Sequence, residues 1–148
     1  MMLSQPTSLT TPIQVMFFDT DVGGVVHNIA YLRFVETTRT LLAVQLGLEW
    51  KWMQEQSIFP VILKTEIEYH APALVGDLLN VHVHLGQATG VRFWCHFEIT
   101  RPTDSKLIVN GKQALAFVKM PKGKPLRLPK TFPTPFIPTL PVKHSEPL

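Results

Sequence analysis

The chain has 148 residues, of which 45% are hydrophobic and 17% are charged, and its formal net charge is +3. This length predicts one domain with a real core, and this composition excludes a disordered chain. The lysine and arginine residues are scattered except near the C-terminus, so we expect no nucleic-acid partner, whereas a mildly basic surface favours a phosphorylated small ligand.

The cysteine content and the N-terminal residues exclude further classes of protein. The single cysteine, Cys95, excludes an intramolecular disulfide and a multi-cysteine metal site, and it falls in an apolar row that indicates the core. The first residues lack the basic and apolar regions of a secretory signal. No apolar run approaches the roughly 20 residues of a membrane span. We therefore expect a cytoplasmic protein without a membrane partner.

The first half of the chain predicts a short strand followed by one long helix. Residues 1–11 are polar and contain proline, which is typical of a loose N-terminal arm. Apolar residues alternate over residues 13–17, which predicts the strand. Apolar positions then follow helical spacing over residues 28–46, and Gly47 suits the position after a helix end. The helical stripe consists of Ile29, Leu32, Val35, Leu42 and Leu46.

The second half predicts four antiparallel strands separated by turns. Period-two alternation places them at residues 61–70, 79–85, 91–99 and 107–118, with Gly111 as a candidate bulge. One amphipathic helix and a sheet with one apolar face are buried together only if the sheet wraps around the helix. The sequence therefore predicts an α+β domain over residues 12–130 with a single central helix. Residues 131–148 continue a proline-rich segment that cannot enter the sheet and are expected to form a C-terminal arm.

Residues 17–36, FFDTDVGGVVHNIAYLRFVE, place two carboxylates and a glycine pair just before the helix. A helix start offers unpaired N–H groups and a positive dipole end, which suit an anionic group or a developing oxyanion. Asp21 is placed to act there as nucleophile or base. The alternative is that Asp21 caps the helix and that Gly23 and Gly24 form a turn.

Three motifs in this order resemble the hot-dog fold, specifically acyl-CoA thioesterases of the 4-hydroxybenzoyl-CoA thioesterase type. The resemblance covers roughly residues 12–130. The first motif, DVGGVVHNIAYLRFVE, matches the family's pattern at Asp21, Gly24, His27, Asn28 and Tyr31. The second, YHAPALVGDLLNV, matches a strand-to-strand connection at Tyr69, Pro72, Gly76 and Asp77. The third, GKPLRLP, matches the usual end of the last strand.

The resemblance implies that the protein hydrolyses a thioester without a cofactor. Asp21 would attack the carbonyl or activate water, and the carbonyl would accept from a backbone N–H near Asn28, a donor that stabilises an oxyanion by a few kcal/mol. Gly24 would shape the turn, and Tyr31 would pack beside the acyl pocket. His27 would polarise the carbonyl or position water, or would only cap the helix.

The resemblance also implies a substrate and an assembly. The substrate would be an acyl-CoA or an acyl-carrier protein, and the active sites would lie at the interface of a homodimer or homotetramer. Trp50, Trp52 and Phe59 are candidates for setting the depth of the acyl pocket. Basic residues would hold the CoA phosphates, although each is also consistent with a solvated surface charge. These candidates are Arg92, Arg101, Lys119, Lys122 and Arg127.

Two other carboxylates and two other functions stay open. Asp19 would lie on the same side as Asp21 if the backbone were extended, but it is more typical of a solvated or turn-bonding group. Glu36 is expected to pair with Arg33 or Arg39, and it is a reserve catalytic carboxylate because some hot-dog groups carry it on the helix. The alternative functions are a hot-dog hydratase or dehydratase and a non-catalytic acyl-binding protein.

Three histidines invite a zinc interpretation, because His82 and His84 share one strand and His96 lies on the next. Aligning the apolar rows places Val83 across from Phe93 and therefore Arg92 across from His84, which argues against a cation. We expect no metal site. These side chains should instead cover the outer face of the sheet, which with Ile62 and Trp94 would pack against another subunit.

Overall fold

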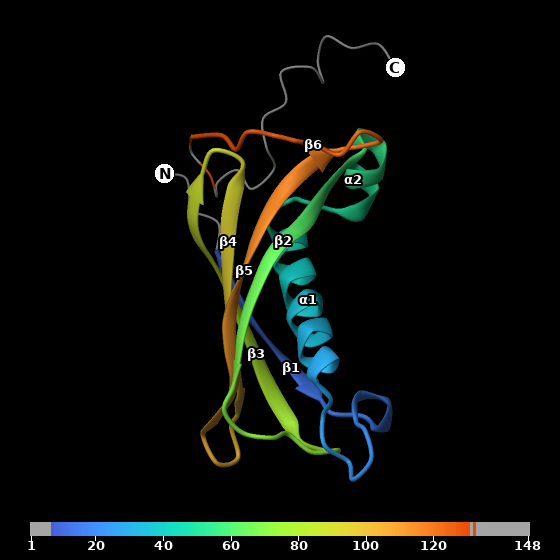
Figure 1. Cartoon of the computed structure of the whole chain (residues 1–148), viewed down its shortest axis with the longest axis vertical. Helices are drawn as coiled ribbons and strands as arrows, with labels where there is room; N and C mark the ends of the chain where they lie inside the picture. The colour runs from blue at the N-terminus through green and yellow to red at the C-terminus, as the bar shows by residue number, and fades with distance from the viewer. Residues whose placement is uncertain (1–6, 131, 133–148) are drawn as a thin grey trace.

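The computed structural model describes residues 7–130 and residue 132. Within them the sheet is antiparallel, with the strand order β1-β3-β4-β5-β2 and a short β6 paired to β5. Figure 1 shows α1 lying lengthwise against this sheet. An antiparallel sheet wrapped around one long helix, as predicted, is therefore confirmed. The elements are β1 (Ser8–Gln14), η1 (Phe17–Asp19), α1 (Asn28–Gln45), α2 (Trp50–Gln56), β2 (Ile58–Tyr69), β3 (Leu78–Thr89), β4 (Arg92–Arg101), β5 (Lys106–Lys119) and β6 (Lys124–Pro125).

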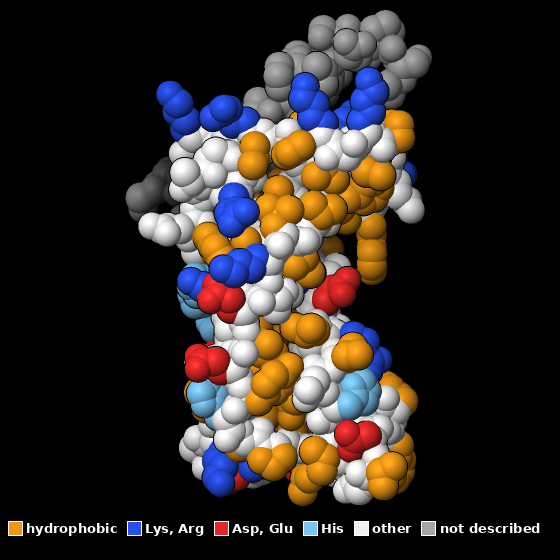
Figure 2. All heavy atoms as spheres, viewed as in Figure 1, with side chains coloured by type: hydrophobic (Ala, Val, Ile, Leu, Met, Phe, Trp, Pro, Cys, Tyr) orange, Lys and Arg blue, Asp and Glu red, His pale blue; other side chains and the backbone are white. Residues whose placement is uncertain are grey.

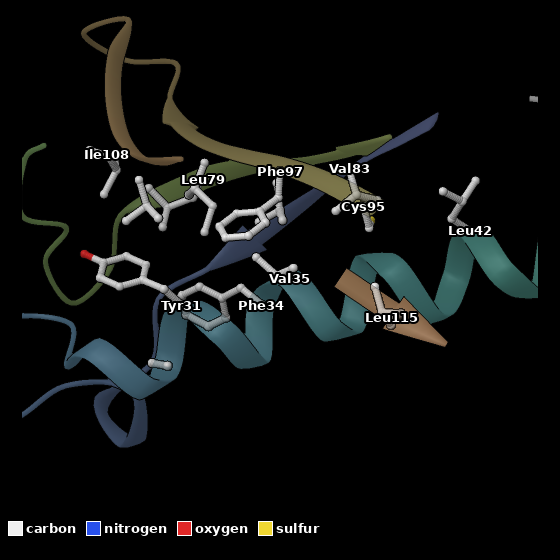
Figure 3. Close-up of a cluster of buried hydrophobic side chains, with 14 of the residues drawn as sticks. Tyr31, Phe34, Val35, Leu42, Leu79, Val83, Cys95, Phe97, Ile108 and Leu115 are labelled. Atoms are coloured by element: carbon white, nitrogen blue, oxygen red, sulfur yellow. The ribbon is translucent and has the colours of Figure 1, made fainter. Parts of the chain in front are cut away.

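The core lies between α1 and the concave face of the sheet. Figure 3 shows Tyr31 and Val35 of α1 on the side that faces Leu79 and Phe97 of the sheet, with Phe34 beside Tyr31, and all five side chains are buried. The helix ends as predicted, because Gly47 follows the C-cap with a φ of 96° that favours glycine. The predicted stripe is wrong at Ile29, which is 67% exposed, because the buried stripe runs instead through Ala30 and Phe34.

The first strand begins earlier than the sequence predicts. Strand β1 spans Ser8–Gln14 and pairs with β3 from His84 to Leu78. Residues 8–11 therefore belong to the sheet and not to a loose arm, because alternating side chains of β1 turn inward against α1 and β3. The predicted strand over residues 13–17 also ends too late, because β1 stops at Gln14 and Phe17 lies exposed in η1. Residues 1–6 of the predicted arm, and all but residue 132 of the C-terminal arm, lie outside the described residues.

Strand β2 forms one edge of the sheet and changes face part-way along. Its pairing with β5 shifts between Ile62 and Lys64, so the bulge falls at Leu63. Because of this bulge Ile62 lies opposite Leu115, a core residue on the helix side of the sheet. The prediction that Ile62 shares the outer face with Trp94 is therefore wrong.

Gly111 is not a bulge, because it pairs in regular register with Ile67 and Phe97. A glycine is required for a different reason. A Cβ at this position would overlap the backbone oxygen of Glu66 and would lie 2.7 Å from the ring of Phe97. Strand β5 therefore approaches β2 more closely than any other residue would allow.

Replacing Gly111 with alanine should destabilise the fold by about 3 kcal/mol, at the upper end of overpacking effects, because backbone rather than a flexible side chain must give way. Urea unfolding at neutral pH would measure the change. Lys106→Ala is the matched control, since it changes an exposed residue of the same strand and should leave the midpoint unchanged. An unchanged midpoint for Gly111→Ala would contradict this prediction, since it would mean that β2 and β5 move apart to admit the methyl group without loss of stability.

Candidate active site

Asp21 lies in a tight turn that precedes α1. Its backbone N–H donates to the Val25 carbonyl at 3.0 Å, and its own carbonyl accepts from the Gly24 N–H at 3.1 Å. Gly23 and Gly24 have φ values of 94° and 74°, which only glycine adopts without strain. The turn leaves the Asp21 side chain exposed to solvent. Asp21 therefore supplies a carboxylate that is open to a ligand.

Asp19 has a structural role. Its side chain is 5% exposed, and its Oδ2 accepts from the Met16 N–H at 2.9 Å. Its Oδ1 lies 3.5 Å from Nη2 of Arg33, and its backbone carbonyl accepts from the His27 N–H at 3.1 Å. The extended backbone that would align Asp19 with Asp21 is absent, because Asp19 ends η1. The turn-bonding interpretation of Asp19 is consistent with these contacts.

The N-terminus of α1 has an open donor next to this turn. His27 is the N-cap, and its Nδ1 accepts from the Ala30 N–H at 3.3 Å. A neutral ring with this tautomer carries its proton on Nε2, which leaves a donor for a ligand. The Asn28 N–H has no acceptor among the described residues, as expected for the first turn of a helix. An oxyanion placed here would meet an unpaired N–H and the positive end of the helix dipole.

An open depression of about 300 Å³ lies beside this helix start, between Asn28, Tyr31 and Tyr69. Tyr31 is buried, and its hydroxyl accepts from the Ala73 N–H at 3.2 Å. Burial raises the pKa of the Tyr31 hydroxyl, so this group stays neutral. The Tyr31 ring packs against Tyr69 at 5.9 Å between centroids. Tyr31 therefore forms a fixed wall of the depression, and its predicted place beside an acyl group stays a prediction.

The connection between β2 and β3 supports the Asp21 turn. The Val26 N–H donates to the Ala73 carbonyl at 2.9 Å, and the Val75 N–H donates to the Gly24 carbonyl at 2.8 Å. Gly24 itself is confined, because a Cβ there would lie 3.2 Å from Cγ1 of Val75. The second sequence motif, which contains Ala73 and Val75, therefore holds the Asp21 turn of the first motif in place.

Arg101 holds this connection in turn. Its Nη1 donates to Asp77 Oδ2 at 2.9 Å and to the Pro72 carbonyl at 3.1 Å, and its Nη2 donates to Asp104 at 2.9 Å. Asp77 Oδ2 also accepts from the Leu74 N–H at 2.9 Å. Most donors of Arg101 are thus engaged within the fold, which weakens the prediction that it binds CoA phosphates.

Replacing Arg101 with methionine should lower the melting temperature by a few degrees at neutral pH. The Arg101 guanidinium lowers the pKa of the Asp104 carboxyl, so this pair stabilises the fold above the usual aspartate pKa, about 4. The contribution is lost as the pH falls through the lowered pKa of folded Asp104. Melting curves at several pH values should therefore show the two proteins converging in acid. A pH-independent difference would contradict the role of this ion pair.

Two of the remaining basic candidates, Arg92 and Lys119, lie far from Asp21 in this chain. Arg92 is exposed at the start of β4, and Nζ of Lys119 donates to the Gln56 carbonyl at the end of α2. Figure 1 shows this end of the molecule opposite the N-terminus of α1. The 18 residues of α1 span about 27 Å. The structure does not bring these two residues together with Asp21, and their role in phosphate binding, like that of Lys122 and Arg127, stays a prediction.

The three histidines do come together, contrary to the predicted register. Strand β3 continues to Thr89, so His84 lies opposite His96 rather than Arg92. These two rings stack at 4.9 Å, and His82 lies 5.8 Å from His84. Burial, followed by the charge of His96, lowers the pKa of His84. No cluster of three histidine, cysteine or acidic side chains suited to a metal ion occurs in residues 7–130 and 132.

A second hollow, of about 300 Å³, is lined by Glu36, Arg39, Trp50 and Phe59. The structure thus brings together two of the three aromatic residues predicted to set the depth of the acyl pocket, whereas sequence reasoning missed Arg39 at this place; whether an acyl group binds here stays a prediction. The predicted ion pairs of Glu36 are wrong. Arg33 pairs with Asp19, and among the described residues no basic side chain lies within 4.0 Å of the Glu36 carboxylate. The three-residue spacing on α1 made Arg33 and Arg39 plausible partners for Glu36. In the folded protein, Arg33 pairs with Asp19 and Arg39 bonds to Gln113 instead.

Comparison with known proteins identifies the family. The model of the thioesterase-like superfamily matches residues 15–136. The acyl-CoA thioesterase YbgC of Haemophilus influenzae is 30% identical over 120 residues, covering 80% of this chain and 87% of that protein. A 1,4-dihydroxy-2-naphthoyl-CoA thioesterase structure from Synechocystis has a TM-score of 0.78 at 23% identity, covering 95% and 99% of the two chains. The 4-hydroxybenzoyl-CoA thioesterase of a Pseudomonas strain has a TM-score of 0.75 at 18% identity, covering 84% of this chain and 94% of that one.

The chain belongs to the thioesterase-like superfamily, because the family model spans most of its length. It has the hot-dog fold, and it is a thioester hydrolase, as the sequence motifs predicted. The roles of individual residues stay predictions. No helix among the described residues is long and apolar enough to cross a membrane.

Proposed function

We propose that the protein hydrolyses acyl-CoA at the N-terminus of α1, with Asp21 as the reacting carboxylate. One observation supports this proposal: an exposed aspartate, fixed in a glycine turn, precedes a helix whose first N–H lacks an acceptor among the described residues. The thioester carbonyl would accept from the Asn28 N–H, and negative charge developing on its oxygen would be stabilised there. His27 would donate from Nε2 to the same oxygen or to water.

Two routes for Asp21 lead to the same products. In the first, the carboxylate attacks the carbonyl carbon, the C–S bond breaks, CoA leaves as thiolate, and water then hydrolyses the acyl-enzyme anhydride. In the second, Asp21 takes a proton from water as that water attacks the carbonyl carbon, and the C–S bond breaks in the collapse of the tetrahedral intermediate. Both routes consume one water and release a carboxylic acid and CoA.

We propose that the working form is a homodimer or homotetramer in the cytoplasm. Strand β2 is an edge strand with open hydrogen-bonding groups, and such edges favour pairing with another strand. Ile62 and Tyr69 on its helix side are 45% and 47% exposed. Figure 2 shows apolar side chains gathered along the face between β2 and α1. A second copy covering this face would also bring its own basic residues toward the site, including Arg92 or Lys119.

The proposed function is tested by thiol release from a panel of thioesters. The panel should contain acetyl-CoA, octanoyl-CoA, palmitoyl-CoA and benzoyl-CoA, with octanoyl-acyl-carrier protein to separate CoA from a carrier protein. Thiol release should be enzyme-dependent for at least one acyl-CoA. Failure on the whole panel would favour a hydratase or an acyl-binding protein, and proton exchange beside the thioester would then identify a hydratase.

A further inference from the structure

Two hollows lie at opposite ends of the face between β2 and α1. Figure 1 shows that α1 and β2 run in opposite directions, so the depression at Asn28 and Tyr69 adjoins one end of both elements. The second hollow, lined by Leu42 of α1 and Pro60 of β2, adjoins the other end. Figure 2 shows apolar side chains along this face, so a thioester carbonyl at the Asn28 N–H would have an apolar direction in which its acyl chain could extend.

Arg39 places a positive charge on the wall of the second hollow. One of its N–H groups donates to Oε1 of Gln113, whose amide in turn donates to Thr65 Oγ1 at 3.2 Å. Gln113 is buried, so this chain of hydrogen bonds fixes the guanidinium between α1, β5 and β2. Burial lowers the pKa of Arg39, but an arginine stays protonated in a protein.

Arg39 has donors to spare. Arginine carries five N–H groups, and Gln113 is the hydrogen-bond partner of Arg39 among the described residues. No buried side-chain nitrogen or oxygen lacks a partner there. The remaining N–H groups of Arg39 therefore reach accessible space, and the hollow is the space that Arg39 lines. No carboxylate lies within 4.0 Å of this guanidinium among the described residues. A ligand without a hydrogen-bond acceptor would therefore remove water from the free N–H groups of Arg39 and give them no new partner, which costs binding free energy.

We propose that Arg39 is a specificity-determining residue that selects acyl groups carrying an oxygen atom far from the thioester. This inference rests on the proposed function, because it needs the acyl chain to run from Asn28 into the second hollow. Arg39 lies eleven positions after Asn28, about 16 Å further along the helix axis. Side chains on a helix lean toward its N-terminus, which shortens the distance to be spanned. A chain of medium length is therefore required, and acetyl would not reach.

The second charged group in the hollow indicates which oxygen is favoured. Glu36 also lines the hollow, and its carboxylate would repel an acyl chain that ends in a carboxylate. A hydroxyl group suits both neighbours, because it accepts from Arg39 and can donate to Glu36. The preferred acyl group is therefore a mainly apolar chain with a hydroxyl at its far end.

The test compares octanoyl-CoA, decanoyl-CoA and dodecanoyl-CoA with their ω-hydroxy and ω-carboxy counterparts. Wild-type protein should show kcat/KM about tenfold higher for an ω-hydroxy chain than for the plain chain of equal length, the effect of one hydrogen bond to a charged group. The ω-carboxy chain should rank below the ω-hydroxy chain. Equal kcat/KM for all three types would overturn the inference while leaving thioester hydrolysis intact. A protein that hydrolyses none of them would overturn both.

Two variants assign the preference to Arg39. Arg39→Met should remove the preference by lowering kcat/KM for the ω-hydroxy chain, with little loss for the plain chain. Arg39→Lys should restore part of it. Lys64→Met is the matched control, since it removes an exposed cation next to Thr65 and should keep the preference. A preference that survives in folded Arg39→Met would overturn the role of Arg39. If that variant does not fold, the wild-type comparison and Arg39→Lys still decide the question.

Discussion

Replacing Asp21 with asparagine is expected to lower kcat for acyl-CoA hydrolysis by about 10³-fold, the scale of losing a general base or nucleophile. The amide is nearly isosteric with the carboxylate, but it can neither attack the carbonyl nor accept a proton from water. The side chain is exposed, and the turn is held by backbone hydrogen bonds, from the Asp21 N–H to the Val25 carbonyl and from the Gly24 N–H to the Asp21 carbonyl. The variant should therefore fold like the wild type and keep a similar KM.

The measurement is thiol release under steady-state conditions, with circular dichroism and a melting curve to verify the fold. Glu98→Gln is the matched control, because it makes the same carboxylate-to-amide change at an exposed position on β4. Unchanged thiol release from Asp21→Asn would remove Asp21 from the mechanism and turn attention to Glu36. Single turnovers in isotopically labelled water address the two routes, since label entering the Asp21 side chain is expected only from direct attack.

The elements of the fold were predictable wherever one periodicity ran long enough. The helix over residues 28–46 and the four later strands overlap α1 and β2 to β5, because the apolar residues of each segment follow one period over many positions. The first strand was misplaced because Ser8–Gln14 is half polar and pairs as an edge strand. Its partner, β3, is distant in sequence, and a local pattern of apolar residues does not predict pairing between distant segments.

The pairing register of the strands could not be predicted from the sequence, for a physical reason. Aligning apolar rows fixes which face a side chain takes, but several alignments that differ by an even number of residues satisfy the same pattern. The extension of β3 to Thr89 and the irregularity between Leu85 and Ala88 selected the pairing of His84 with His96. At Leu63 a bulge reversed even the face, which moved Ile62 to the helix side.

The parts of the candidate site that are contiguous in sequence could be predicted, and the parts that only the fold brings together could not. The contiguous segment from Asp21 to Tyr31 could be located from the sequence, because its parts are neighbours along the chain. The Arg39–Gln113–Thr65 chain could not, since it joins three elements that meet only in the folded protein. Arg101 was assigned to phosphates for the same reason, because its partners Asp77 and Pro72 come from another connection.

Replacing Asn28 with proline should lower kcat by about 10²-fold to 10³-fold, the loss expected when one oxyanion donor is removed. Proline deletes the backbone N–H, and Asn28 is the first residue of α1, where proline is well tolerated. The preceding residue, His27, has φ −80° and ψ 156°, an extended conformation that a following proline favours. The substitution therefore removes the proposed donor while the helix is retained.

Asn28→Ala separates the donor from the side chain. It keeps the N–H and removes the amide, so its kcat should stay within a few-fold of the wild type. Helical content and melting temperature should be close to wild type in both variants. If Asn28→Pro retained full activity, the oxyanion would have to be bound elsewhere, with the Ile29 N–H of the same turn as the next candidate. If both variants lost activity equally, the side chain of Asn28 rather than its backbone would carry the function. A large loss confined to proline would identify the start of α1, next to the Asp21 turn, as the oxyanion site.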